Sequence, residues 1–238
     1  MQIALIGYGK MGKAIHEQAI KRGHSIPLII DLQNKQDLNA ENLKKADAVI
    51  EFTTPETAFD NVSFCLRHGV PVICGSTGWL HKLNEAKEIA NQHHTGLIVA
   101  SNFSVGVNLF FELNKKLAEL MRHHQDYHPE LLEVHHTQKL DSPSGTAISL
   151  AEQILERIPE KTKWVNHSSE NKNELVILSE RQDPAPGTHH VKYRSAIDDI
   201  EIIHTAHNRT GFALGAVIAA EFLKGKQGCF SMKDVLGF

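Results

Sequence analysis

A glycine-rich turn between an apolar run and a helical segment places the strongest constraint on how this chain can fold. Residues 3–6 are apolar, and the sequence then reads Gly7-Tyr8-Gly9-Lys10-Met11-Gly12. Residues 10–22 follow as a predicted helix whose apolar stripe is Met11, Ile15, Ala19 and Ile20. A second apolar run, residues 26–31, ends on Asp31. A strand, a glycine turn, a helix and a second strand in this order predict a parallel βαβ unit.

The three glycines of this turn also favour a ligand. Gly7 permits a tight turn, Gly9 lets a pyrophosphate approach the backbone, and Gly12 lets the helix pack closely on the strand. The start of the helix offers N–H groups and a positive dipole end to phosphates. We therefore predict a dinucleotide site that includes Gly7, Tyr8, Gly9, Lys10, Met11 and Gly12. The alternative is a tight turn that binds no ligand.

Asp31 bears on which nicotinamide dinucleotide would bind. It lies 19 residues after Gly12, close to the spacing of about 20 for an acidic residue that binds the ribose hydroxyls. A carboxylate at this position favours NADH, because it repels the 2′-phosphate of NADPH. Lys35 follows closely and would relieve that repulsion. The predicted cofactor is therefore NADH, NADPH or both.

The alternation of strand and helix signals continues to about residue 100. Apolar runs at 46–52, 70–74 and 97–100 are separated by helical segments at 55–67 and 80–93. This pattern predicts a parallel sheet of the Rossmann type with helices on both faces. Ligands of such sheets bind at the carboxyl ends of the strands. Two turns that follow strands are therefore candidate cofactor contacts, although each alone would pass for an ordinary loop: Gly75, Ser76, Thr77, Ala100, Ser101, Asn102 and Phe103.

The pattern changes after Asn102. Residues 105–123 are predicted to form a long helix with Leu120 on its buried face, and a second helix is predicted at 144–158, followed by a polar loop at 160–173. Strand candidates lie at 131–135, 175–178, 190–195 and 200–207. This order predicts an α+β domain with a largely antiparallel sheet. An apolar helix at 212–223 is assigned to the first domain. The predicted domains are 1–103 with 208–238, which bind the dinucleotide, and 104–207, which bind the substrate.

Residues 133–147 concentrate the groups that a reaction would need. They read EVHHTQKLDSPSGTA. Histidine is the side chain best suited to proton transfer near neutral pH, so His135 or His136 could act as an acid beside the fixed cation Lys139. Ser144 is a candidate helix N-cap, which would leave N–H groups at Gly145 and Thr146 to bind a carboxylate. We therefore predict a site that holds a small dianionic substrate while it is protonated.

This segment also has structural explanations that involve no catalysis. Adjacent histidines usually lie on the surface, and the Pro-Ser-Gly-Thr sequence can be a simple helix start. Neighbouring histidines on a strand also face opposite ways, so at most one of the pair would point at a given atom. A metal site would need a third ligand, which the sequence does not identify, so no metal is predicted. The co-occurrence of the histidines, the lysine and the turn favours catalysis.

Composition excludes several classes of function. The net charge of −3 offers no basic surface for nucleic acid. The three cysteines, Cys65, Cys74 and Cys229, show no C-x-x-C spacing, which indicates a reducing, cytoplasmic setting. The N-terminus lacks the basic region of a signal peptide, and the apolar stretch at 212–220 is shorter than the about 20 residues that span a bilayer. A cytoplasmic protein with a small-molecule substrate is expected.

Five motifs together resemble one enzyme family. These are the glycine turn, Phe52-Thr53-Thr54-Pro55-Glu56, Gly75-Ser76-Thr77-Gly78, residues 100–108 and residues 133–147. Their order and spacing are similar to those of the 4-hydroxy-tetrahydrodipicolinate reductase (dihydrodipicolinate reductase) family of lysine and diaminopimelate synthesis. The resemblance implies that a nicotinamide hydride goes to C4 of a cyclic, unsaturated imine dicarboxylate, which forms when the 4-hydroxy substrate loses water.

The resemblance also implies roles for individual residues. His135 matches the catalytic proton donor, and Lys139 matches a lysine with a proton-donor or substrate-binding role. His136, Gly145 and Thr146 match substrate contacts. The glycine turn, Asp31, residues 75–77 and residues 100–103 match cofactor contacts. The second domain would bind the substrate and build a homotetramer, with a hinge that lets it close on the first.

The chain departs from the family pattern at several positions, and two alternative functions are open. Thr137 and Gln138 replace frequent basic residues, which predicts a less positive pocket, and Ser101 and Ser142 replace other common residues. The short 32–46 region bears on the choice between NADH and NADPH. One alternative is another two-domain amino-acid dehydrogenase, against which the Ser-Gly-Thr turn argues. The other is a non-catalytic nucleotide-sensing Rossmann protein, which would leave residues 133–147 without a purpose.

Overall fold

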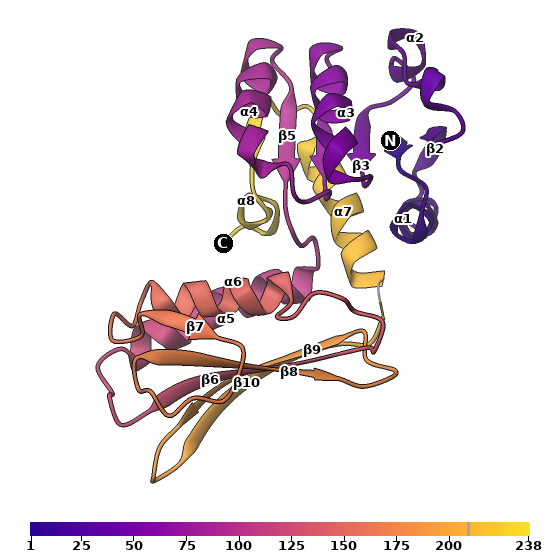
Figure 1. Ribbon diagram of the computed structural model, residues 1–238. Helices are drawn as coiled ribbons and strands as arrows, with labels where there is room; N and C mark the ends of the chain where they lie inside the picture. Colours follow the sequence, from indigo (N-terminus) through magenta and orange to yellow (C-terminus); the bar gives the residue numbers. More distant parts are fainter. Residues whose placement is uncertain (209) are drawn as a thin grey trace. The chain divides into compact units, whose positions relative to one another are not determined.

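The computed structural model describes residues 1–208 and 210–238, and the chain divides into two compact units. One unit comprises residues 1–105 with the C-terminal segment 209–238, and the other comprises residues 106–208. The elements of both are labelled in Figure 1. Because the chain leaves the first unit and later returns to it, the second unit is an insertion in the first.

The first unit is built on a six-stranded sheet with the order β11-β5-β4-β3-β1-β2. All its pairings are parallel. Side chains along β1 alternate between the two faces, so Ile3 and Leu5 enter one core and Ala4 and Ile6 the other. The expected Rossmann-type sheet is confirmed. Its strands are β1 (Gln2–Ile6), β2 (Ser25–Ile30), β3 (Ala48–Glu51), β4 (Val72–Cys74), β5 (Gly96–Val99) and β11 (Gly228–Phe230).

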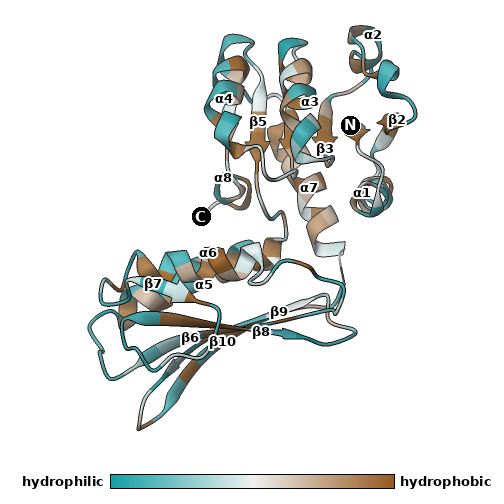
Figure 2. Ribbon diagram, viewed as in Figure 1, coloured by the Kyte–Doolittle hydropathy of each residue, from teal (hydrophilic) through white to brown (hydrophobic). Residues whose placement is uncertain are grey.

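Helices cover both faces of this sheet. The core that contains Ile3 and Leu5 is completed by α1 (Lys10–Lys21), α7 (Thr210–Leu223) and α8 (Met232–Leu236). The opposite core is completed by α2 (Ala40–Leu43), α3 (Pro55–Arg67) and α4 (Leu83–Gln92). Two 3₁₀ helices, η1 (Lys35–Asp37) and η2 (Leu80–Lys82), precede α2 and α4. Figure 2 shows that α7 is coloured mostly white to brown, as a helix packed on a sheet should be, whereas α1 carries many teal residues.

The predicted buried stripe of α1 is wrong at Ile20, which is 52% exposed. The buried residues of this helix are Gly12, Ile15, Gln18 and Ala19. α1 packs against both the sheet and α7, which centres its buried face on Ile15 and Ala19. Each residue advances about 100° around a helix, so Ile20 points away from that face.

The second unit contains a five-stranded mixed sheet with the order β10-β9-β6-β8-β7. β9 pairs antiparallel with β10 and β6, while β8 pairs parallel with β6 and β7. The two longest pairings are the antiparallel ones, so the sheet is largely antiparallel as expected. Helices α5 (Val105–Met121) and α6 (Gly145–Leu155) share the core of this unit with one face of the sheet. The strands are β6 (His128–His135), β7 (Lys163–Val165), β8 (Glu174–Arg181), β9 (Gly187–Arg194) and β10 (Asp199–Ala206).

Several local expectations in this unit and near the C-terminus are wrong. Leu120 is 58% exposed, because the buried face of α5 includes Asn114, whose amide donates to the Leu150 carbonyl and to Gln153. The predicted loop at 160–173 contains β7, and β11 and α8 were not expected at all. Among the described residues, none of the helices is both long and apolar enough to cross a membrane.

Candidate active site

In the glycine turn of the first unit, packing requires two of the three glycines but not the third. Gly7 has a φ of 94°, and a Cβ there would lie 2.0 Å from the Phe52 carbonyl oxygen. A Cβ on Gly12 would lie 2.1 Å from the Gly7 carbonyl oxygen. A Cβ on Gly9 would meet no atom within 4 Å. Packing therefore explains the first two glycines, while the open space over Gly9 suits a ligand that approaches the backbone.

Two cavities meet at this turn. One has a volume of about 340 Å³ and is lined by Gly7, Tyr8, Gly9, Asp31, Lys35, Thr53 and neighbouring residues. The other has a volume of about 330 Å³ and is lined by Gly9, Lys10, Met11, Gly12, Gly75, Ser76, Thr77 and neighbouring residues. Gly9, Phe52 and Thr53 belong to both linings. α1 begins between them without a side-chain cap, so this region fits an elongated ligand with phosphates at the helix start.

The segment that follows β2 presents both an acid and a cation to the larger cavity. Asp31 is exposed and accepts a hydrogen bond from the Leu32 amide at 2.9 Å. Asn34 accepts from the Asp31 amide at 2.7 Å and holds the turn. Lys35 lines the same cavity. A carboxylate for ribose hydroxyls and an ammonium group for a 2′-phosphate are thus both present.

Residues 100–103 differ in burial and in hydrogen bonding. The Ala100 amide donates to the Cys74 carbonyl at 3.2 Å, so this turn begins at the sheet edge. Phe103 is 2% exposed and packs against Phe52, with ring centroids 5.9 Å apart. Asn102 is buried and accepts from the Ser104 amide at 2.9 Å, while Ser101 is exposed. The Phe103 side chain therefore belongs to the core of the first unit.

Glu51 is a buried acid at the cofactor edge that sequence reasoning missed. It ends β3, is 0% exposed, and accepts from the Thr53 amide at 3.1 Å and from the Thr53 hydroxyl. The Cys74 thiol donates to it at 3.0 Å. These bonds shape the Thr53 turn that lines both cavities. An acid at the end of an apolar run was the available signal.

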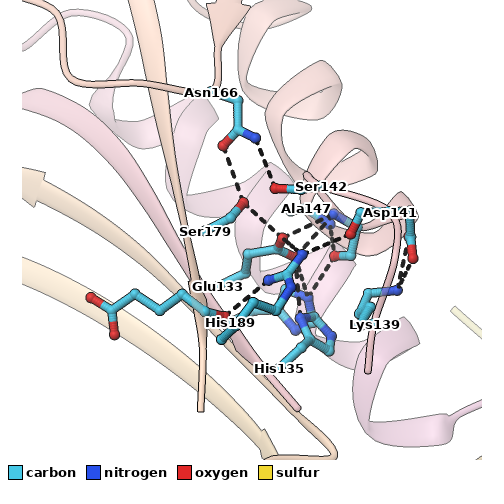
Figure 3. Close-up of polar contacts among 12 residues, drawn as sticks. Glu133, His135, Lys139, Asp141, Ser142, Ala147, Asn166, Ser179 and His189 are labelled. Carbon is cyan, nitrogen blue, oxygen red and sulfur yellow. Dashed lines mark hydrogen bonds and ion pairs between the residues drawn. The ribbon is translucent and has the colours of Figure 1, made fainter. Parts of the chain in front are cut away.

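In the second unit, Glu133 is the centre of a polar cluster (Figure 3). It is 0% exposed and lies on β6 directly opposite His189 of β9 and Ser179 of β8. Its Oε2 lies 3.3 Å from His135 Nδ1, and Ser179 Oγ donates to its Oε1 at 2.8 Å. The Ser144 amide donates to both carboxylate oxygens, at 3.0 and 3.1 Å. One carboxylate thus joins three strands and the start of α6.

The charges of this cluster follow from burial and hydrogen bonding. Burial alone would raise the pKa of Glu133, but hydrogen bonds from His135, Ser144 and Ser179 outweigh it and lower the pKa to about 2. Burial, aided by the charge of His135, lowers the pKa of His189 to about 3. At neutral pH the centre is therefore a carboxylate beside a neutral His189.

The segment after β6 carries the remaining predicted substrate residues. His135 is the last residue of β6 and is 7% exposed, whereas His136 lies outside the strand and its amide donates to Ala185 at 2.8 Å. Lys139 Nζ lies 2.7 and 2.8 Å from the two Asp141 carboxylate oxygens. Lys139 therefore has a counter-ion in this structure, which a substrate carboxylate would have to replace or share.

The start of α6 confirms the expected N-cap. Ser144 Oγ accepts from the Ala147 amide at 3.2 Å and lies 3.2 Å from His189 Nε2. The Ala147 amide is thus the one that the cap uses. Gly145 is exposed, and a Cβ there would meet no atom within 4 Å. Thr146 is half-buried in the same turn.

His189, Ser179 and Arg181 were not among the predicted site residues. Arg181 Nη2 lies 3.5 Å from Glu133 and donates to the Asp141 carbonyl at 2.7 Å. Glu133, His135 and His189 place potential ligand atoms within 4.8 Å of one another. Both Glu133 oxygens already accept hydrogen bonds from the Ser144 amide or the Ser179 hydroxyl, so we interpret the three residues as part of a polar cluster around this carboxylate.

Comparisons with known proteins identify the family. The models for the N-terminus and the C-terminus of dihydrodipicolinate reductase match residues 1–103 and 106–236. The 4-hydroxy-tetrahydrodipicolinate reductase of Christiangramia forsetii is 50% identical over 238 residues, which are 99% of this chain and 98% of that relative. The enzyme of the same name from Clostridium tetani is 32% identical over 252 residues and covers 99% and 97%.

A solved structure shares the fold. The dipicolinate-bound dihydrodipicolinate reductase from Paenisporosarcina sp. TG-14 matches with a TM-score of 0.77 at 24% sequence identity, over 97% of each chain. The two family models divide the chain between residues 103 and 106, where the first unit is followed by the second. This chain therefore belongs to the dihydrodipicolinate reductase family.

Proposed function

We propose that this protein reduces 4-hydroxy-tetrahydrodipicolinate, via dihydrodipicolinate, to tetrahydrodipicolinate with NADH or NADPH, in lysine and diaminopimelate biosynthesis. Relatives that carry this name align over nearly the whole chain. The observation that carries the proposal for this molecule is the Glu133–His135 pair, 3.3 Å apart, beside the capped start of α6. A buried acid–base pair next to a helix start suits a substrate that is anionic and must be protonated.

The first unit would hold the cofactor, which when bound supplies a hydride to C4 of the substrate ring. The open space over Gly9 and the uncapped start of α1 support this assignment. Asp31 would bind ribose hydroxyls, and Lys35 would tolerate a 2′-phosphate. The residues assigned to the cofactor are Gly7, Tyr8, Gly9, Lys10, Met11, Gly12, Asp31, Gly75, Ser76, Thr77, Ala100, Ser101, Asn102 and Phe103.

The second unit would hold the dicarboxylate and manage its proton. Gly145 and Thr146, in the first turn of α6, would bind one carboxylate at the positive end of the helix dipole. Lys139 and His136 would add donors from the segment between β6 and α6. Reduction of the conjugated imine leaves negative charge on the ring, which one proton neutralises. His135 would donate that proton, because its Nδ1 faces Glu133 and its other nitrogen remains for the substrate.

We further propose a homotetramer built through the second unit. Ile203, His190, Leu132 and Leu178 are register neighbours across β10, β9, β6 and β8. They point away from the core that α5 and α6 share with the sheet, since their chain neighbours Ile202, Val191, Leu131 and Ile177 enter it. Ile203 is 52% exposed and Leu178 is 38% exposed. The apolar members of this row, Ile203, Leu132 and Leu178, support association of copies, while His190 pairs with Glu201 at 2.7 Å.

We also propose a cytoplasmic location. All three cysteines are free thiols, as is usual in a reducing compartment.

A coupled assay tests the proposed reaction. The hydroxy-tetrahydrodipicolinate is generated enzymatically, this protein is added, and oxidation of NADH and of NADPH is followed by absorbance in separate runs. We expect oxidation that depends on the substrate, and a turnover lower by about 10²-fold or more in His135→Ala, because the general acid is lost.

His128→Ala is the matched control, since His128 is an exposed histidine at the other end of β6. It should turn over like the wild type. If neither cofactor is oxidised by the wild type, the proposed reaction is wrong. If His135→Ala turns over at the rate of the wild type, His135 is not the acid.

A further inference from the structure

The buried carboxylate of Glu133 lies where it can control His135, although no role in the reaction has been assigned to it. The two residues are two apart on β6, so both side chains point to the same face of the sheet. Glu133 Oε2 lies 3.3 Å from His135 Nδ1. The Nε2 edge of the ring lies beside Gly187, where a Cβ would come within 3.0 Å of it. Glycine at 187 therefore leaves space at the nitrogen that faces away from Glu133.

Glu133 itself is held from several directions. The Ser144 amide donates to both of its oxygens, at 3.0 and 3.1 Å, and Ser179 donates to Oε1 at 2.8 Å. Arg181 Nη2 lies 3.5 Å away. A carboxylate fixed by this many donors cannot swing, so it imposes one orientation on the imidazole. Burial of the carboxylate also strengthens its interaction with a protonated ring.

We propose that Glu133 is a positioning residue that keeps His135 protonated on Nδ1 and presents Nε2 to the substrate, while the same carboxylate fixes the start of α6 through Ser144. This inference rests on the proposed function. An orienting carboxylate that sets a histidine tautomer contributes up to about 10⁴ in kcat in other enzymes. In this protein the Glu133 carboxylate would also fix the position of His135 relative to the start of α6, which is proposed to bind the substrate carboxylate.

The surroundings of the pair contain a limited set of charged or titratable groups. His189 faces it from β9, with ring centroids 5.1 Å apart from His135, and its low pKa keeps it neutral. Arg181 faces it from β8, and Lys139 and Asp141 face it from the segment before α6. Glu133 is thus the negative group in closest contact with the His135 ring among the described residues. Loss of its charge should destabilise the imidazolium.

The test variant is Glu133→Gln, which keeps the size and the acceptor oxygen of the side chain but removes its charge. We expect kcat to fall by about 10²-fold or more, and the alkaline limb of the pH–rate profile to move to lower pH. Affinity for pyridine-2,6-dicarboxylate, a planar dicarboxylate probe, should change much less, because a glutamine oxygen can still accept from the Ser144 amide. Glu130→Gln is the control, since Glu130 lies on the same strand and pairs with Arg194.

A second readout does not depend on activity. Nitrogen-15 NMR of the histidine rings reports which ring nitrogen carries the proton, and the His135 signals are identified by their loss in His135→Gln. We expect Nδ1–H in the wild type and a shift toward Nε2–H in Glu133→Gln. If Glu133→Gln does not fold, Ser179→Ala, which removes one donor to Glu133, should give a smaller change in the same direction.

These readouts separate the two proposals. An inactive wild type with the expected Nδ1–H tautomer would reject the proposed reaction and keep the positioning role. A wild type with Nε2–H, or a Glu133→Gln variant with an unchanged tautomer and pH profile, would overturn the positioning role. In that case Glu133 would be a structural cap, and the variant would lose thermal stability alone.

Discussion

At the scale of single residues, His189 links folding stability to pH. Its side chain is buried, 3.2 Å from the Ser144 hydroxyl. Burial lowers its pKa from 6.5 to about 3. When the pH falls below 6.5, the unfolded chain takes up a proton at this residue and the folded chain does not. Stability from His189 is therefore complete above that pH and is lost progressively as the pH falls toward 3.

We expect His189→Gln to remove this dependence. In urea unfolding between about pH 7 and about pH 5, the wild type should lose up to about 1.4 kcal/mol per pH unit more than the variant, once the pH is below the unfolded pKa. The exposed His128 provides the control, and His128→Gln should follow the wild type. Parallel curves for the wild type and His189→Gln would contradict a neutral, buried His189.

The sequence was informative about His135 and uninformative about His189, for a physical reason. Glu133, His135 and the Ser144 cap lie within one short segment, so their proximity follows from local structure. His189 reaches Glu133 through the register of β9 on β6, and Ser179 does so through β8. Which residue of β9 or β8 lies opposite Glu133 depends on strand register, which the hydrophobic patterns of the paired strands and the turns between them set together.

At the scale of elements, α7 contains a glycine that helix propensity alone would disfavour. A Cβ on Gly215 would lie 1.8 Å from the Phe103 carbonyl oxygen and 2.8 Å from its carbonyl carbon. α7 therefore packs against the backbone that follows β5 at a distance only glycine permits. Gly211, one turn earlier, would place a Cβ at an ordinary 3.5 Å from Ser104 Oγ.

Alanine at these two positions should have opposite effects. Gly215→Ala should lower the free energy of unfolding by about 1–3 kcal/mol through overpacking. Gly211→Ala should be neutral or stabilise by up to about 1 kcal/mol, because alanine favours a helix over glycine. Thermal or denaturant unfolding of both variants measures the difference. Equal stability of the two would show that the contact of Gly215 with Phe103 relaxes without cost.

The elements themselves were predicted well where the pattern was long. The helices α1, α3 and α5 and the strands β1 to β5 of the parallel sheet follow from apolar patterns, which report an element but not its neighbours. Ile20 and Leu120 were therefore assigned to buried faces that the tertiary packing places elsewhere. β4, β7 and β11 have three residues each. β4 is fully buried and lies in an apolar run, whereas β7 and β11 are partly exposed, carry no such run, and form by pairing with an adjacent strand.

At the scale of the whole molecule, the open face of the second sheet predicts association. Ile203→Arg places a charge beside Leu132 and Leu178 on this face without entering the core, since Ile203 is 52% exposed in the single chain. We expect a tetramer for the wild type and smaller species for this variant in light scattering after size exclusion, with unchanged circular dichroism. Ile197→Arg is the control, because Ile197 is 89% exposed outside the sheet. A tetramer that survives Ile203→Arg would place the interface elsewhere.

The insertion of the second unit within the first has a consequence for synthesis on the ribosome. The chain makes β1 to β5 early, but α7, which completes the core around Ile3, Leu5 and Ile50, emerges only after residues 106–208. At about 5–20 residues per second, that delay is on the order of 10 s. During this interval one apolar face of the nascent parallel sheet lacks α7 and α8, whereas the contiguous second unit can fold as soon as it emerges. Nascent chains halted before residue 210 should accordingly be the species that chaperones retain.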